Sequence, residues 1–592
     1  MLKQKNYDAD LCVVGGGLAG LTAAISAARE GLHVVLMHER PMLGGNASSE
    51  IRMWVCGAGG EDNRETGIIE EIMLENAYRN PTKSYAVWDT VLYDFAKREK
   101  NLTLLLNCTC MDAETEKGEF ADGRNTKIKS VTGYQMTTQS FCKVNAKFFC
   151  DSSGDSILAP LCGAEFKIGR ESDKAYGEDT NTKVDDDLTM GNSCLIYGRE
   201  TNNKVDFIPP KWAENITDED VKDRYVGVDI DYENFWYLEL GGTKNTIDDA
   251  EEIRDELIPL AVGMWDYVKN KTKGAENWDL DFLGFLPGKR ESRRMVGEYI
   301  ITSKDIFENK VFEDEIAYGG WSIDDHYPGG FYHRGKPNKL AATPAPYSLP
   351  YRCLYSKNVE NLFFAGRNIS MTHMAMSSIR VMATCSLLGE AVGKAASVAV
   401  KYGITPHKVY LEKIKEVQNL LLKEDCFLPS LKREISNTCK SARLEGADDS
   451  IRNGEDRAHK IYGNGGKTAG VTVDLNSKIT YILNGEKVDT VHIVFDNDMG
   501  RKTLNGGSYE QRYGTRANIK LSAPKYIMPK TLCKSFKLLG VCNNNEFEIL
   551  NVKENRQRAY NVKVDKKLDK LVLIPLESWG EDNKTTVISF DF

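Results

Sequence analysis

The opening residues follow a strand, turn, helix and strand pattern of hydrophobic positions. Residues 10–14 form a short apolar run, which is typical of a strand buried on both faces. Residues 18–30 are rich in alanine and stop at Gly31, as a helix does. A second apolar run covers residues 33–37. The pattern predicts one βαβ unit with two parallel strands.

The next segment changes to alternating apolar and polar residues. Strand-like stretches at 102–110, 129–138 and 141–151 are separated by polar turns, which predicts a β-meander inserted in the same fold. Much later, residues 375–402 carry many small residues and end before Gly403, which predicts one long helix. From about residue 460 the chain consists of short alternating strands with Gly, Asn and Asp turns, which predicts a separate β-sandwich.

These patterns predict an α/β fold with an insertion and an all-β end. We expect a three-layer Rossmann-like domain whose first part is 1–190 and whose second part is 346–403, with a substrate (cap) domain inserted at 191–345. A helical linker at 404–454 and the β-sandwich at 455–592 complete the chain.

Composition narrows the function classes. The chain has 592 residues and a net charge of -9, which disfavours a nucleic-acid partner because phosphates need a basic surface. It contains no run of about 18 apolar residues, so no membrane span is predicted. Nothing at the start reads as a signal peptide, and we expect a cytoplasmic protein. Its 14 cysteines include no C-x-x-C pair, so no metal site is expected.

The turn of the βαβ unit carries a G-x-G-x-x-G motif. Gly15 permits the tight turn, Gly17 lets the backbone approach a pyrophosphate, and Gly20 lets the helix pack against the strand. The helix amides that begin near Leu18 favour an anion. Glu39 ends the second strand and is placed to accept hydrogen bonds from a ribose diol. The unit therefore predicts a dinucleotide site.

Residues after Glu39 indicate which dinucleotide. The stretch 40–49 contains Gly44, Gly45 and Asn46, and it resembles the glutathione-reductase-type FAD-binding fold. Two distant segments agree with that resemblance. Residues 148–155 resemble the Asp-x-Thr-Gly motif with serine in place of threonine, and residues 361–368 resemble the C-terminal flavin motif with Arg-Asn in place of Asp.

The Arg-Asn pair in place of Asp resembles the pattern of one particular family, the FAD-dependent oxidoreductases related to fumarate reductase flavoproteins. Segments 288–299, 319–326 and 370–381 also match its pattern, and the resemblance covers about residues 8–403. It implies a non-covalently bound FAD, because residues 44–53 contain no histidine for a covalent link. No second G-x-G-x-x-G unit is present for a nicotinamide, so the electron acceptor is unknown.

The resemblance also implies which residues contact FAD and that a helix beginning near Ala375 directs its amides at the flavin ring. The implied FAD-binding residues are Gly15, Gly17, Leu18, Ala19, Gly20, Glu39, Arg40, Gly44, Gly45, Asn46, Ser48, Arg52, Cys110, Ser153, Gly154, Asp155, Gly366, Arg367, Asn368, Ser378 and Ile379.

Two histidines are candidates for acid–base chemistry in the substrate region. Oxidation of a C–H that bears a hydroxyl requires a base for the hydroxyl proton, and an imidazole suits that role. His326 follows Asp324 and Asp325, either of which can fix its tautomer, and His373 lies just before the predicted flavin-facing helix. The alternative for each is a hydrogen-bonded structural histidine.

Two further features have two interpretations each. Arg290 lies in a basic cluster at 289–294 that either holds an anionic substrate or forms an ion-paired surface with interleaved glutamates. Cys56 is either a redox thiol near the flavin or a small packing residue.

We therefore predict an FAD-dependent oxidoreductase that transfers a hydride between flavin N5 and a small polar substrate. A sugar or sugar derivative is the first choice, because the cap region is rich in Trp, Tyr and Asp and the segment ending at Trp579 resembles galactose-binding-type sandwiches. One alternative is a reductase of activated double bonds, as in fumarate reductases. Another is a flavin-containing protein that binds a glycan or a partner. A homo-oligomer stays open.

Overall fold

The computed structural model describes residues 2–60, 62–120, 123–180, 182–228, 234–457, 470–501, 504 and 513–592. The chain folds into two compact units. Unit 1 consists of Met1–Gly59, Thr82–Val417 and Tyr513–Lys525, and unit 2 consists of Gly60–Pro81, Gln418–Arg512 and Tyr526–Phe592. The division after Val417 falls inside the segment expected as a helical linker, while the boundaries at 190 and 345 stay predictions.

Unit 1 is built on a parallel sheet, as the opening pattern predicts. The parallel strands lie in the order β3 (Leu102–Leu105), β2 (Val34–Met37), β1 (Lys3–Val14), β6 (Ser140–Asp151) and β18 (Leu362–Phe364). The four β2 residues are buried, because helices or other strands cover both faces of a parallel sheet. This arrangement confirms the Rossmann-like α/β class.

The predicted meander extends the same sheet. β4 (Cys108–Lys117) pairs with β5 (Thr126–Gln135), and β5 pairs with β6, both antiparallel. The expected strand at 102–110 is wrong as one element, because the chain turns at Asn107, whose φ is 53°. Its two halves are β3 and β4.

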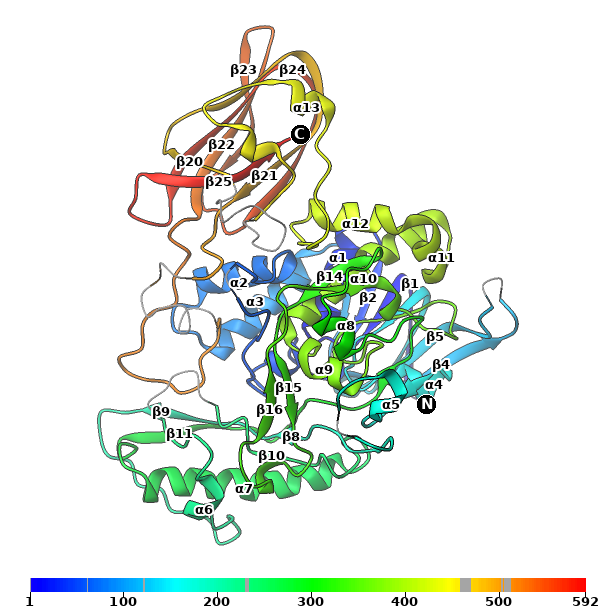
Figure 1. Cartoon of the computed structure of the whole chain (residues 1–592), viewed down its shortest axis with the longest axis vertical. Helices are drawn as coiled ribbons and strands as arrows, with labels where there is room; N and C mark the ends of the chain where they lie inside the picture. Colours follow the sequence, from blue (N-terminus) through cyan, green and yellow to red (C-terminus); the bar gives the residue numbers. More distant parts are fainter. Residues whose placement is uncertain are drawn as a thin grey trace. The chain divides into compact units, whose positions relative to one another are not determined.

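Two helices that are far apart in the sequence of unit 1 pack against each other. α1 (Leu18–Arg29) packs against α10 (Met382–Tyr402), and the hydroxyl of Thr22 donates to the carbonyl of Ser386 at 2.7 Å. Glycine is required at 389, because a Cβ there would lie 2.0 Å from the carbonyl oxygen of Ala19. This contact holds α10 against α1 (Figure 1).

The expectation of one helix over 375–402 is wrong. The structure has α9 (His373–Ile379) and then α10, with Val381 in an extended conformation at φ −66° and ψ 142° as the N-cap of α10. The helix end that faces the glycine turn region therefore begins at Met382 and not near Ala375.

A small sheet of the cap brings three segments together. β8 (Asn192–Ser193) pairs with both β10 (Glu239–Leu240) and β12 (Gly288–Lys289). Behind it lies α7 (Ala250–Lys271), which contacts β10 and buries Trp265 in a hydrophobic core. The sheet places residues that are far apart in sequence at one wall of the cavity described below.

Unit 1 also contains the following helices and strands. They are α3 (Tyr85–Arg98), α4 (Leu158–Cys162), β7 (Phe166–Lys167), α5 (Asp173–Tyr176), β9 (Ile196–Glu200), α6 (Asp218–Val221), β11 (Trp278–Leu283), β13 (Arg294–Met295), α8 (Ser303–Phe307), β14 (Glu315–Gly319), β15 (Ile323–His326), β16 (Asn338–Ala341), β17 (Tyr347–Pro350) and α11 (Pro406–Lys408). α12 (Ile414–Lys423) runs across the division between the units.

Unit 2 is an antiparallel β-structure whose described helices include α2 (Ile68–Arg79) and α13 (Asn437–Ser441). Its strands form one sheet in the order β20, β25, β21, β24, β22 and β23, with β19 paired to β21. Rings of this sheet pack in a buried core, with Tyr481 5.3 Å from Phe590 and Phe495 5.0 Å from Phe536. The strands are β19 (Arg443–Glu445), β20 (Val471–Asp474), β21 (Ile479–Phe495), β22 (Cys533–Cys542), β23 (Asn545–Val552), β24 (Ala559–Ser578) and β25 (Lys584–Asp591).

Among the described residues, no helix is both long and apolar enough to cross a bilayer. In the same part of the chain, no group of three or more His, Cys, Asp or Glu residues is arranged to hold a metal ion.

Candidate functional site

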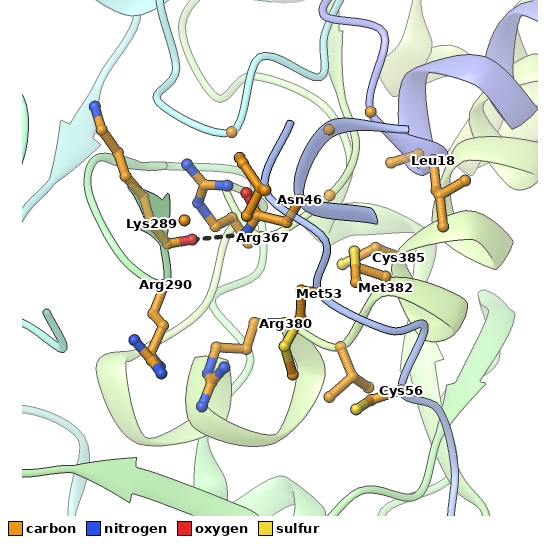
Figure 2. A pocket seen from close by; sticks show the side chains of 18 of the residues that line it. Leu18, Asn46, Met53, Cys56, Lys289, Arg290, Arg367, Arg380, Met382 and Cys385 are labelled. Carbon is orange, nitrogen blue, oxygen red and sulfur yellow. Dashed lines mark hydrogen bonds between the residues drawn. The ribbon is translucent and has the colours of Figure 1, made fainter. Parts of the chain in front are cut away.

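A cavity of about 370 Å³ in unit 1 begins at the glycine turn and reaches the cap sheet. Figure 2 shows a close view of this pocket, where Asn46 donates to the carbonyl of Lys289 at 3.0 Å and so connects the two parts. Fifteen of the predicted residues line it: Gly15, Gly17, Leu18, Ala19, Glu39, Arg40, Gly44, Gly45, Asn46, Ser153, Gly154, Arg290, His326, Gly366 and Arg367.

The glycine turn has the geometry of a dinucleotide cradle. Gly15 has φ 106°, and a Cβ there would lie 2.3 Å from the carbonyl oxygen of Ser152. A Cβ on Gly20 would lie 1.9 Å from the carbonyl oxygen of Gly15. Gly17 instead lines the cavity, and a Cβ added there would have the Cα of Gly45 as its nearest neighbour, at 3.9 Å. The backbone therefore leaves room for a phosphate at Gly17.

Buried donors beside the cradle also fit a large anionic cofactor. Among the described residues, no hydrogen-bond partner lies within reach of Nη1 of Arg40 or Nε of Arg367, and both side chains line the cavity. Buried polar atoms are normally paired in folded proteins, so unpaired donors at a cavity wall point to a ligand. The residues present fit FAD.

The carboxylate of Asp151 orders the turn of segment 148–155, which resembles the Asp-x-Thr-Gly motif. Asp151 accepts from the hydroxyl of Ser153 at 2.7 Å and from the amide of Leu158 at 2.8 Å. The serine hydroxyl is thus used within the turn, which explains why serine can replace threonine there. Gly154 has φ 79°, and a Cβ on it would meet the guanidinium of Arg367 at 2.6 Å, so glycine keeps that arginine in place.

The neighbourhood of Glu39 leaves its carboxylate accessible. The ring of His38 accepts from the amide of Gly16 at 2.9 Å, and its Nε2 lies 2.9 Å from the carbonyl oxygen of Met42. These two contacts fit the tautomer with hydrogen on Nε2. The side chain of Glu39 is 40% exposed and lines the cavity, in a position suited to a ribose.

The other end of the cavity contains a buried histidine, glutamate and arginine. Nδ1 of His326 lies 2.6 Å from Oε2 of Glu239, and Nη1 of Arg290 lies 3.3 Å from the same oxygen. Burial alone would raise the pKa of Glu239, but the charges of Arg290 and His326 and the hydrogen bond from His326 lower it below its ordinary value. Glu239 is therefore ionised and holds both partners.

A second ion pair lines the same end. Nη2 of Arg380 lies 3.3 Å from Oδ2 of Asp324, and the amide of Asn338 donates to Oδ1. Burial would raise the pKa of Asp324, but His326 and Arg380 together with the Asn338 bond hold it below its ordinary range. Nε2 of His326 is 3.4 Å from Oδ2 of Asp324. Figure 2 shows the side chains of Arg290 and Arg380 extending from separate segments.

His373 lies in a different, buried network and does not line the cavity. Its Nδ1 is 2.9 Å from Glu291 and its Nε2 is 3.1 Å from Asp325, while Glu291 also pairs with Arg294. Burial alone would lower the pKa of His373, but the charges and hydrogen bonds of Glu291 and Asp325 raise it to about 10. His373 is therefore held as a cation.

Alternation along β15 explains the separation of the two networks. Successive side chains of a strand point to opposite faces, so Asp324 and His326 face the cavity while Asp325 faces His373. Of the two aspartates expected beside His326, only Asp324 contacts it, and the closer partner is Glu239.

Several predicted residues lie away from the cavity wall. Arg52 stacks on the ring of Phe282 at 4.1 Å, and Ser378 bonds to the hydroxyl of Tyr347 at 2.6 Å. The predicted residues outside the wall are Gly20, Ser48, Arg52, Cys110, Asp155, Asn368, His373, Ser378 and Ile379.

Other wall residues escaped the sequence reasoning. Glu239, Ser193, Trp236, Asn338 and Leu340 come from segments without a recognised motif. Others, such as Lys289, Trp321, Arg380 and Val381, lie inside the quoted motifs, which was the available signal. Cys56, for which a packing role was one interpretation, also lines the cavity.

Comparison with known proteins gives one family. The family model described as FAD dependent oxidoreductase matches residues 10–421. No curated protein matches the chain.

Solved structures are similar at low identity. A geranylgeranyl bacteriochlorophyll reductase-like protein from Thermoplasma acidophilum is 14% identical over 71% of this chain and 86% of that chain, with a TM-score of 0.31. A quinol fumarate reductase FrdA variant from E. coli is 11% identical over 71% of this chain and 78% of that chain, with a TM-score of 0.26. A family 32 carbohydrate-binding module of Streptococcus pneumoniae EndoD is 12% identical over 26% of this chain and 97% of that chain, with a TM-score of 0.19.

Proposed function

Because the chain belongs to the FAD-dependent oxidoreductase family, we propose that it oxidises a hydroxyl-bearing carbon of a small polar substrate. The observation that carries the proposal is the contact of 2.6 Å between Nδ1 of His326 and Glu239 at the wall of the cavity. A histidine whose one ring nitrogen is held by a carboxylate has its other nitrogen available for a proton.

The cofactor is held by residues of the cradle. Gly15 and Gly17 would approach its diphosphate, Glu39 its ribose, and Arg40 and Arg367 would donate to its oxygens. When bound, FAD supplies the acceptor for a hydride. The backbone amides at the start of α10, near Met382, would stabilise negative charge that develops beside them.

His326 takes the proton in this proposal. In the neutral ring with hydrogen on Nδ1 donated to Glu239, the lone pair is on Nε2, 3.4 Å from Oδ2 of Asp324, and it would accept the proton of a hydroxyl that binds beside that carboxylate. The C–H bond breaks with its electron pair leaving as hydride, the O–H bond breaks with its proton going to Nε2, and a carbonyl forms. Glu239 stabilises the imidazolium that results.

A second candidate function has its own supporting observation. Arg290 and Arg380 both line the cavity, and arginine pairs bind carboxylates in a bidentate manner. They would hold the carboxylate of an activated double bond while His326 donates a proton. Glu239 and Asp324 already occupy these arginines in part, which favours the first function.

Anaerobic mixing of the FAD-loaded chain with substrates tests the choice. We expect hexoses, pentoses or polyols to abolish the yellow flavin absorbance and enoates to leave it unchanged. If dithionite-reduced protein is reoxidised by an enoate and no hydroxylated compound reduces the flavin, the reductase function holds instead. The glycan-binding alternative for the C-terminal sandwich stays a prediction.

A further inference from the structure

We infer that the substrate is a neutral polyhydroxylated ring, a sugar or glycoside without a carboxylate, sulfate or phosphate group. The inference rests on the proposed function and names the substrate class of the same cavity. It is carried by the ion pairs of the lysine and arginine side chains that line the wall among the described residues.

At the substrate end, each arginine already has a carboxylate counter-ion within the cavity. Arg290 contacts Glu239 at 3.3 Å and donates to the hydroxyl of Ser193 at 2.8 Å. Arg380 contacts Asp324 at 3.3 Å. Each arginine charge is therefore balanced by a carboxylate of the chain itself. Among the described residues, Nε of Arg380 has no hydrogen-bond partner, so it is a donor that a substrate hydroxyl oxygen can accept from.

The other lysine and arginine side chains of the described wall also contact carboxylates. Lys289 and Arg367 both contact Asp155, at 2.7 and 2.9 Å. Arg40 contacts Glu39 at 3.3 Å. These three lie on the side of the cradle, where the diphosphate of the cofactor already brings negative charge.

An anionic substrate would therefore meet carboxylates. A group close enough to bond to Arg290 or Arg380 also lies close to Glu239 or Asp324, both of which are ionised. Like charges repel strongly in a partly buried site. At this end of the cavity each arginine charge is balanced by one carboxylate, so an anion gains no net positive charge there.

The same groups suit hydroxyls. Each hydroxyl both donates and accepts a hydrogen bond, and the wall offers paired donors and acceptors in Arg380, Asp324 and the amide of Asn338. Trp236 and Trp321 also line the cavity, and aromatic rings pack against the apolar face of a sugar ring. The ring of Trp236 lies 5.2 Å from that of His326, so such a face is beside the proposed proton acceptor.

Matched neutral and acidic sugars test the inference on the FAD-loaded chain. The probes are glucose with glucuronate and galactose with galacturonate, mixed anaerobically, with both flavin reduction and the perturbation of the oxidised flavin spectrum recorded. We expect each neutral member to bind at least about 10-fold more tightly than its acid. An acid that binds as tightly as its neutral partner overturns the inference.

A charge variant makes the test independent of overall affinity. In Asp324→Asn the guanidinium of Arg380 loses its counter-ion, so the preference should shift by at least about 10-fold toward the acids. Asp186→Asn is the matched control, because Asp186 pairs with Arg170 at 2.6 Å outside the cavity wall, and it should keep the preference. An unchanged preference in Asp324→Asn contradicts the inference.

The outcomes separate the inference from the proposed function. Spectral perturbation by the neutral sugars without flavin reduction supports the inference and contradicts hydroxyl oxidation of those sugars. Reduction by the acids alone supports hydroxyl oxidation and overturns the inference. If no probe either perturbs or reduces the flavin, both are overturned for hexoses.

Discussion

Nδ1 of His326 lies 2.6 Å from Oε2 of Glu239, although 87 residues separate the two along the chain. Both side chains are 3% exposed. A buried carboxylate and imidazole at this distance fix each other's protonation state, because the carboxylate favours hydrogen on the facing nitrogen. The pair gives the cavity one oriented proton acceptor beside a cofactor cradle.

Replacing this histidine should slow flavin reduction and spare the cofactor. In His326→Gln the proton acceptor is lost, and general base catalysis typically contributes about 10²- to 10⁴-fold. We expect the rate of anaerobic flavin reduction to fall by that factor while the ratio of FAD to protein stays the same. His333→Gln is the control, because His333 stacks on Tyr327 at 3.8 Å and does not line the cavity. An equal loss in both variants would contradict the assignment.

Glu239→Gln tests orientation separately from proton acceptance. The amide keeps the size of the side chain but carries no charge to stabilise an imidazolium and can present its NH₂ group to Nδ1. We expect the reduction rate to fall by roughly 10²-fold or more, because the ionised carboxylate that orients Nδ1 and stabilises the imidazolium is gone. The control is Glu256→Gln, because Glu256 pairs with Lys244 at 2.6 Å away from the cavity wall. An unchanged reduction rate in Glu239→Gln would show that the charge of the glutamate has no part in the reaction.

The cradle could be located from the sequence because its requirements are local. A tight turn at Gly15 and a close helix approach at Gly20 both demand glycine within a few residues, so the spacing itself indicates the turn. The acidic residue after the second strand follows from the length of the βαβ unit. The meander was also predictable, because alternation of period two is a local signal.

The end of the cavity that contains His326 could not be predicted, because it is formed by long-range contacts that no local sequence pattern indicates. Glu239 lies in β10, which pairs with β8, whereas His326 ends β15, which pairs with β16, so their contact joins two separate sheets. The break between α9 and α10 has no glycine or proline at Arg380 or Val381. It is stabilised by tertiary bonds, in which Arg380 pairs with Asp324 and the amide of Ala383 donates to the carbonyl of Cys56 at 2.9 Å.

Two glycines with positive φ should respond differently to alanine. In Gly15→Ala the new methyl collides with the Ser152 carbonyl at 2.3 Å, which displaces the turn under the cofactor. We expect this protein to be purified without FAD and to stay colourless after incubation with it. Gly31→Ala is the control, because Gly31 has φ 89° but nothing lies within 4 Å of the added methyl. It should lose only about 1 to 2 kcal/mol of stability, the typical cost of a left-handed conformation for alanine. A yellow Gly15→Ala protein would contradict the cradle.

The buried cation at His373 predicts a pH-dependent contribution to stability. Its pKa is about 10 in the folded chain and near 6.5 when unfolded, so the folded state binds the proton more tightly. The stabilisation is fully present below about pH 6.5 and is lost as the pH rises through about 10. In His373→Gln this dependence is absent, and Glu291 and Asp325 lose their shared cation. We therefore expect the wild-type protein to unfold at a higher temperature than the variant at pH 6.5, with the difference shrinking toward pH 10, as measured by thermal unfolding of both FAD-loaded proteins across that range. A difference that stays constant with pH would mean that His373 is held as a neutral ring and that Glu291 is balanced by Arg294 alone.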